Sequence, residues 1–140
     1  MKLTVHHLNL VAGNTAGMTD FYTKILGLKD MPERNSGRIT KDKYQGSTSF
    51  VSDGKVEFHL SQADHNVGFR TGHHVNPLDR GHLAFRTDDL ASFKKLLEEN
   101  NIPYSNYGVW GMAGWDQIFF YDPAGNVIEV HEVLEGSPQK

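Results

Sequence analysis

The chain has 140 residues, of which 38% are hydrophobic and 22% charged, a composition typical of one soluble domain or of two small repeated modules. It contains no cysteine, which excludes disulfides, thiolate metal sites and a cysteine nucleophile, so any metal must be held by nitrogen and oxygen ligands. The formal charge of −3, with no block of like charges, argues against nucleic acid or an anionic membrane as the main partner.

The start of the chain carries no apolar signal region. No apolar run approaches the roughly 20 residues needed to span a bilayer. We therefore expect a cytoplasmic protein whose partner is a small-molecule substrate. The eight histidines are the one unusual feature of the composition.

The first half of the chain predicts a strand, a helix and three further strands. The helix is expected at 15–26, where apolar residues recur at helical spacing, and Gly27 is placed to end it in a left-handed conformation. Asp53-Gly54 is a strong two-residue turn signal between the last two strands. The four strands are expected at 3–11, 28–32, 44–52 and 55–62.

The second half repeats this order. A helix is expected from a cap at Asp88 or Asp89 to about Asn100. Its strands are expected at 81–87, 104–109, 115–121 and 126–132. The predicted organisation is a first module at 1–62, a connector without clear periodicity at 63–80, a second module at 81–134 and a C-terminal tail at 135–140.

Local sequence matches support the repeat. His7-Leu8-Asn9-Leu10 opens the first module and His82-Leu83-Ala84-Phe85 opens the second. The closing stretches, 54–59 and 125–130, also match but are out of step by one residue. We expect an α+β fold of two paired βαβββ modules. Their curved sheets each pack an apolar convex face on a helix, and their concave faces form a cup.

Strand alternation predicts which side chains line the cup. Alternate apolar residues, such as Leu8 and Leu10, are assigned to the helix side, and His6 is assigned to that side with them. The cup is expected to be lined by His7, Asn9, Glu57, His59, Ser61, His82, Ala84, Glu129 and His131. Polar residues on an inward face are informative, because burying them without partners costs a few kcal/mol each.

Four of these side chains, His7, His59, His82 and Glu129, are of types that can bind a metal. They are expected to converge, because His7 and His82 occupy matching places in the two repeats, as His59 and Glu129 do within one residue. Two or three imidazoles with one carboxylate suit Zn, Ni, Fe or Mn better than Ca or Mg. A single histidine in a strand is more often structural, and it is the placement in the repeat that favours ligation. Glu57 lies on the same face and is an alternative to His59.

The other histidines are given lesser roles. His131 is expected to support Glu129 or to lie at the rim of the cup. His65, His73 and His74 lie in the connector, where contact with solvent is the default.

At these residues the chain resembles the vicinal oxygen chelate superfamily of glyoxalases, antibiotic-resistance proteins and extradiol dioxygenases. The resemblance rests on His7–Leu10 followed by Phe21–Leu28, on Gly81–Phe85 and on the closing motif Phe119–Glu129. It implies paired βαβββ modules, a homodimer and a divalent metal that binds adjacent oxygens of the substrate. Carried over by position, the implied metal ligands are His7, His82 and Glu129, with His59 at the place of a fourth.

At three places this sequence departs from the motifs of particular branches of the superfamily, and each departure argues against that branch. His59 stands where glyoxalase I and methylmalonyl-CoA epimerase have Glu or Gln, and Phe119 stands where the extradiol closing motif usually has tyrosine. The stretch 107–115 lacks the lysine and serine of the potassium loop in fosfomycin-resistance enzymes. It predicts instead an apolar lid with glycine hinges.

The leading hypothesis is a glyoxalase-like lyase or isomerase acting on a small oxygenated metabolite. A metal would stabilise an enediolate or alkoxide, and Glu129, Glu57 or His59 would move the proton. A non-haem iron extradiol-type dioxygenase is the alternative, because it uses two histidines and one carboxylate. A metal-free, drug-binding resistance protein is a third, although it would not need the ligand set.

Overall fold

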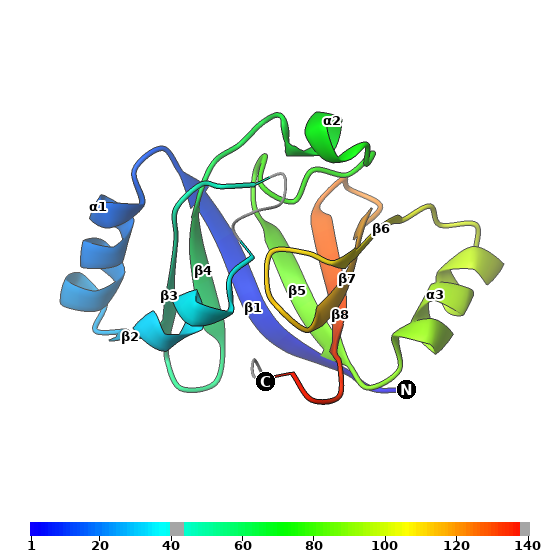
Figure 1. Ribbon diagram of the computed structural model, residues 1–140, viewed down its shortest axis with the longest axis horizontal. Helices are drawn as coiled ribbons and strands as arrows, with labels where there is room; N and C mark the ends of the chain where they lie inside the picture. The colour runs from blue at the N-terminus through cyan, green and yellow to red at the C-terminus, as the bar shows by residue number, and fades with distance from the viewer. Residues whose placement is uncertain (40–43, 138–140) are drawn as a thin grey trace.

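One mixed sheet of eight strands organises the chain in the computed structural model, which describes residues 1–39 and 44–137 (Figure 1). Its strand order is β2-β3-β4-β1-β5-β8-β7-β6. In chain order the strands are β1 (Leu3–Ala12), β2 (Lys29–Asp30), β3 (Thr48–Ser52), β4 (Glu57–Gln62), β5 (His82–Thr87), β6 (Ser105–Val109), β7 (Trp115–Tyr121) and β8 (Val127–Val133). The helices are α1 (Thr15–Asp20), the π-helix η1 (Phe21–Ile25), the 3-10 helix η2 (Pro32–Gly37), α2 (Val67–Thr71) and α3 (Leu90–Glu99).

The predicted α+β fold with two βαβββ modules is confirmed. Within each module the first strand runs parallel to the last, β1 to β4 and β5 to β8. The two modules are joined edge to edge, because β1 pairs antiparallel with β5, so their sheets form one continuous sheet. Figure 1 shows α1 and α3 at the two ends of this arrangement, with the central strands between them.

A pseudo-twofold relation places equivalent residues of the two modules side by side. It passes through the Leu8↔Leu83 pair of β1 and β5, so that His7 corresponds to His82 and Asn9 to Ala84. Asn9 pairs with His59 on β4, and Ala84 pairs with Glu129 on β8. His59 and Glu129 are therefore equivalent.

The predicted one-residue mismatch between the closing stretches is wrong, because it was counted from two turn glycines. β3 ends at Ser52 and β4 begins at Glu57, which leaves a loop of four residues. β7 ends at Tyr121 and β8 begins at Val127, which leaves five. Counted from the strand pairing instead, the two modules are in register.

A β-bulge in β1 overturns the prediction for His6. The pairing with β5 shifts between Val5, opposite Phe85, and His7, opposite Ala84, so that His6 is an extra residue in β1. A bulge of this kind interrupts the alternation of side chains. His6 and His7 therefore both face the cup, and Val5 lies on the outer face with Phe85.

The predicted elements are found with shifted ends. The first helix is divided into α1 and η1, and Gly27 follows with a φ of 74°, as expected for a helix end. The first strand of the hairpin starts at 48 and not at 44. Asp89 is the N-cap of α3, since its carboxylate accepts a hydrogen bond from the Ser92 N–H. β8 runs to Val133.

The connector holds the short helix α2, which the sequence did not predict because five residues are too few to show a period. The apolar residues Val67, Val75 and Leu78 of the connector pack in a buried cluster with Tyr107 and Phe119 of the second module. The last three residues of the predicted tail lie outside the described residues. In the part of the chain that the structure describes, no helix is long and apolar enough to cross a membrane.

Gly81 connects the fold to the site, because it lies directly before His82 at the β1–β5 seam. Its φ is 82°, and a Cβ at this position would lie 2.2 Å from the carbonyl oxygen of Asn9. We expect Gly81→Ala to lower the free energy of unfolding by roughly 2–4 kcal/mol, from backbone strain and steric overlap together. Urea denaturation measures this change.

Gly54→Ala is the matched control. Gly54 also has a positive φ, of 99°, but an added Cβ there would meet no atom within 4 Å among the described residues. Its expected cost is therefore the backbone term alone, about 1 kcal/mol. Equal losses in the two variants would show that the close approach at Gly81 is unimportant.

Candidate metal centre

Three buried side chains from three strands meet at one carboxylate oxygen. Glu129 on β8 has an exposed fraction of 2%. Its Oε1 lies 3.6 Å from Nε2 of His7 on β1 and 3.1 Å from Nε2 of His82 on β5. The structure thus brings together the three residues that the sequence predicted as ligands.

The hydrogen bonds of His82 determine which of its nitrogens carries the proton. Nδ1 lies 2.7 Å from the carbonyl oxygen of Pro77, which can only accept. Nδ1 is therefore protonated, and Nε2, which points to Glu129, carries a lone pair in the neutral ring.

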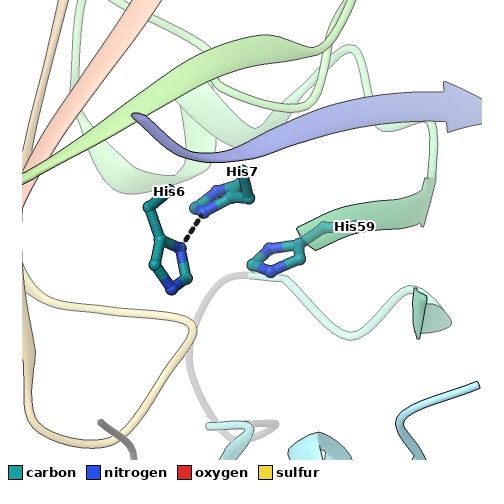
Figure 2. Close-up of side chains that lie close together, drawn as sticks. All are labelled: His6, His7 and His59. Carbon is teal, nitrogen blue, oxygen red and sulfur yellow. Dashed lines mark hydrogen bonds between the residues drawn. The ribbon is translucent and has the colours of Figure 1, made fainter. Parts of the chain in front are cut away.

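The proton on His7 is assigned by a chain of partners that ends at Glu57. His7 Nδ1 lies 2.8 Å from His6 Nδ1 (Figure 2). His6 Nε2 lies 3.4 Å from the Glu57 carboxylate. His6 therefore directs its Nε2 proton to the carboxylate and accepts from His7 at Nδ1. His7 Nε2 is left with a lone pair, which also faces Glu129.

His131 is a positioning residue and not a ligand. Its Nε2 accepts from Arg86 Nε at 2.9 Å, and a guanidinium can only donate. Its Nδ1 therefore carries the proton and donates to Glu129 Oε2 at 2.6 Å. His131 is fully buried and stacked on Trp115, with ring centroids 4.5 Å apart, so it does not lie at the rim of the cup.

When both rings are neutral, two imidazole lone pairs therefore face a carboxylate oxygen. A proton or a metal ion shared among these atoms would relieve their repulsion. Metal–nitrogen and metal–oxygen bonds of about 2.0–2.2 Å separate neighbouring ligand atoms by about 3.0–3.4 Å at ordinary coordination angles. The two separations to Glu129 Oε1, 3.1 and 3.6 Å, lie close to this range, so each imidazole–carboxylate pair has a spacing that suits a divalent ion. Among the described residues, the groups whose possible ligand atoms all lie within 4.8 Å of one another are His7 with Glu129 and His131, and His7 with His6 and His59.

His59 adds a third imidazole beside this group. Its ring is stacked on His7, with centroids 3.7 Å apart, as Figure 2 shows. Its Nε2 is 3.0 Å from Glu57 Oε1, which assigns the proton to Nε2 and leaves a lone pair on Nδ1.

Glu57 anchors the cluster from the side away from the cavity. It accepts a hydrogen bond from Arg34 at 2.6 Å as well as those from His6 and His59. It is not among the residues that line the cavity beside the ligands. From the sequence we expected Glu57 to be a ligand or a proton carrier. Its position in the structure favours instead a role in orienting His6 and His59.

Burial and charge act in opposite directions on the pKa values of this cluster. Loss of solvent lowers the pKa of His7 well below its usual range, and it lowers the pKa of His59 to about 4. Burial alone would raise the pKa of Glu129, but the imidazoles around it outweigh that effect and hold its pKa well below the usual range. Neutral imidazoles and an ionised carboxylate are the forms that bind a metal.

A cavity of about 60 Å³ opens above these residues and is closed by the segment 107–115. Trp110, Gly111 and Met112 line it together with His7, His59, His82 and Glu129. Backbone hydrogen bonds fasten this segment to the first module, from Ile39 N–H to Gly111 C=O and from Ala113 N–H to Gly37 C=O, both at 2.7 Å. Gly108, Gly111 and Gly114 have positive φ, and the prediction that they act as hinges of a lid stays a prediction.

Sequence reasoning missed three polar partners of the site, namely His6, Arg34 and Arg86. The His6-His7 pair was a signal, but alternation assigned His6 to the opposite face. The two arginines have no motif, and both lie over the ring of Trp115, at 5.7 and 5.1 Å.

The connector histidines lie apart from this cluster. His65 is exposed, as expected. His73 is only partly exposed, because its ring stacks on Tyr107 at 4.0 Å.

The chain matches the model of the Glyoxalase/Bleomycin resistance protein/Dioxygenase superfamily over residues 4–130, and it therefore belongs to this family. An Arabidopsis thaliana protein named Glyoxylase I 4 is 27% identical over 128 residues, which are 91% of this chain and 69% of that protein.

Two solved structures show the same fold at low sequence identity. A hypothetical protein of Bacillus halodurans has a TM-score of 0.68 at 16% identity, covering 98% of this chain and 99% of its own. Methylmalonyl-CoA epimerase from Mycobacterium tuberculosis has a TM-score of 0.67 at 15% identity, covering 91% of this chain and 86% of its own.

The lowered histidine pKa values predict that the metal-free protein loses stability in mild acid. Between pH 6.5 and about 4 the unfolded chain protonates His59 and the folded chain does not, so unfolding is favoured as the pH falls. His59 gives the free energy of unfolding no pH dependence above pH 6.5, where its ring is neutral in both states. The free energy of unfolding falls by on the order of 3 kcal/mol between pH 6.5 and pH 4, at about 1.4 kcal/mol per pKa unit.

Urea denaturation with a chelator, at half-unit steps from pH 7.5 to 4.5, measures this loss. His59→Gln is the matched variant and should show a shallower decline over the same window. Parallel profiles for the two proteins would contradict the buried, neutral His59.

Proposed function

We propose that this protein is a divalent-metal-dependent lyase or isomerase of the glyoxalase type, acting on a small oxygenated metabolite. His7, His82, Glu129 and His59 would hold the metal. The observation that carries the proposal is the meeting of two buried imidazoles with a buried carboxylate, whose Oε1 lies 3.6 Å from His7 Nε2 and 3.1 Å from His82 Nε2. Nitrogen and oxygen donors of this kind suit Zn, Ni, Fe or Mn.

A metal bound here would polarise a carbonyl oxygen of the substrate. The protein's own residues would set its position and its surroundings. His131 and Arg86 hold Glu129 Oε2, while Glu57 and His6 hold His7. Trp110 and Met112 cover the cavity, so water would be largely excluded when substrate is bound.

Of the three residues expected to move the proton, Glu129 and His59 line the cavity, and proton transfer is proposed for these two. Glu57 is not proposed for this role, because its oxygens are occupied by Arg34, His6 and His59 outside the cavity lining. Its proposed role is to orient the imidazoles, as the partners of metal ligands commonly do.

The same donor set is compatible with an iron dioxygenase, but the residue beside His82 argues against ring cleavage. Phe119 is buried, its ring centroid is 5.3 Å from that of His82, and it supplies no hydroxyl group. Oxygen uptake with catechols by the iron-loaded protein would favour the dioxygenase instead.

A homodimer is proposed on the basis of the outer face of the central strands. Leu3 and Val5, which lie on the same face of β1, are 40% and 48% exposed. Exposed apolar residues gathered on one face are typical of an interface.

The first test of the proposal is the metal itself. We expect about one divalent ion per chain by mass spectrometry, on protein purified without a nickel column. Glu129→Ala should lower metal affinity by at least about 100-fold, since removal of a mere partner of a ligand already costs 10- to 100-fold. Isomerisation of a 2-oxoaldehyde, assayed with and without glutathione, should fall in parallel.

His65→Ala is the control for this variant, because His65 is exposed and lies outside the cluster. It should retain wild-type metal content. Full metal occupancy in Glu129→Ala, or no metal above background in the wild type, would refute the site.

The role of His59 is testable by counting imidazoles at the metal. As a ligand through Nδ1 it brings the count to three, and His59→Ala should reduce it to two. X-ray absorption at the metal edge measures this number directly. A count of two in both proteins would show that His59 only supports the site, whatever its effect on affinity.

A further inference from the structure

Two carboxamide side chains lie in the cavity beside the proposed metal ligands. Asn9 and Gln117 are 6% and 4% exposed, and both line the cavity that His7, His82 and Glu129 line. The buried atoms Asn9 Oδ1 and Gln117 Oε1 have no hydrogen-bond partner within residues 1–39 and 44–137. Buried polar atoms are normally paired, so a pair of unpaired ones at one cavity indicates a ligand that pairs with them.

The strand pairing places both side chains next to the ligand set. Asn9 on β1 lies opposite His59 on β4 and opposite His82 on β5. Gln117 on β7 lies opposite His131 on β8, two residues from Glu129. A substrate atom that binds a metal between these histidines and Glu129 would therefore place its neighbouring atoms near the two carboxamides.

Two further residues that line this cavity, Ser61 and Trp110, carry polar atoms. Asn9 Nδ2 donates to Ser61 Oγ at 2.9 Å, which holds the amide in place. Trp110 Nε1, in the lid segment, is a third buried polar atom for which the described residues supply no partner. The site thus offers two carboxamides and one N–H donor around a space of about 60 Å³, which holds only a few non-hydrogen atoms.

We propose that Asn9 and Gln117 bind a hydroxyl group of the substrate, and that the substrate is therefore a small hydroxylated carbonyl compound. This inference rests on the proposed function, because the hydroxyl is placed next to the oxygens that bind the metal. A hydroxyl has one proton to donate and two lone pairs, so it can donate to Asn9 Oδ1, which the bond to Ser61 orients, and accept from the Gln117 amide after a flip of its oxygen and nitrogen or from the Trp110 N–H. An alkyl group in the same place would leave the buried carboxamide atoms unpaired.

A pair of chelating probes of nearly equal size tests this. Glycolohydroxamate and propionohydroxamate bind metals through the same two adjacent oxygens and differ in a terminal hydroxyl against a methyl group. Both are titrated into the zinc-loaded protein by calorimetry. Glycolohydroxamate should bind at least about tenfold more tightly than propionohydroxamate, as expected when a buried polar group gains or loses its partner.

Two substitutions assign the preference to its residues. Asn9→Leu and Gln117→Met nearly keep side-chain size and remove the carboxamide, and each should reduce the ratio of the two affinities to below about threefold. The affinity for propionohydroxamate should stay near the wild-type value, which verifies folding and metal loading in the same experiment. Gln62→Met, at the exposed end of β4, is the control and should keep the full ratio.

The outcomes separate this inference from the function on which it rests. Zinc uptake with equal binding of the two hydroxamates overturns the hydroxyl site and leaves the metal site standing. A full ratio in both cavity variants overturns the assignment to Asn9 and Gln117. A wild-type protein that takes up no zinc overturns the proposed function, and the inference with it. If Asn9→Leu does not fold, Gln117→Met and the wild-type ratio decide.

Discussion

The negative charge of Glu129 governs the arrangement around it. A carboxylate taken out of water requires several kcal/mol of compensation. In this protein the compensation comes from His131, which is itself held by Arg86, and from the imidazoles of His7 and His82 on its other oxygen. The proposed metal would act on this second side, where it would add a positive charge beside the buried carboxylate.

The bulge in β1 connects a second buried carboxylate, Glu57 of the first module, to the imidazole cluster. By adding His6 to the cup side, it builds a continuous path of hydrogen bonds from Glu57 through His6 to His7. Glu57 is in turn held directly by Arg34, whereas Arg86 acts on Glu129 only through His131. Each acid therefore has a distinct task, one facing the cavity and the other setting the direction of the ring protons.

The sequence was sufficient for the modules and for the convergence of His7, His82, His59 and Glu129, because strand periodicity and the repeat are local signals. It was insufficient for His6, since a bulge depends on the pairing of β1 with β5 and leaves no mark in the pattern of β1 alone. It missed Arg34 and Arg86 for a similar reason. Long side chains reach a site from positions that periodicity does not identify, and α2 was too short to show a helical period.

The pseudo-twofold relation has a further consequence, because the equivalent positions carry different chemistry. His59 corresponds to Glu129, and Asn9 corresponds to Ala84. Two copies of the first half would assemble four imidazoles with no anion at the centre, and two copies of the second would assemble two mutually repelling carboxylates. Only the combination of the two different halves places one carboxylate, Glu129, beside the imidazoles at the cavity. The two modules of the one chain thus contribute different side chains at equivalent positions. The two faces of the cavity therefore offer a substrate an asymmetric environment, which a site with true twofold symmetry would lack.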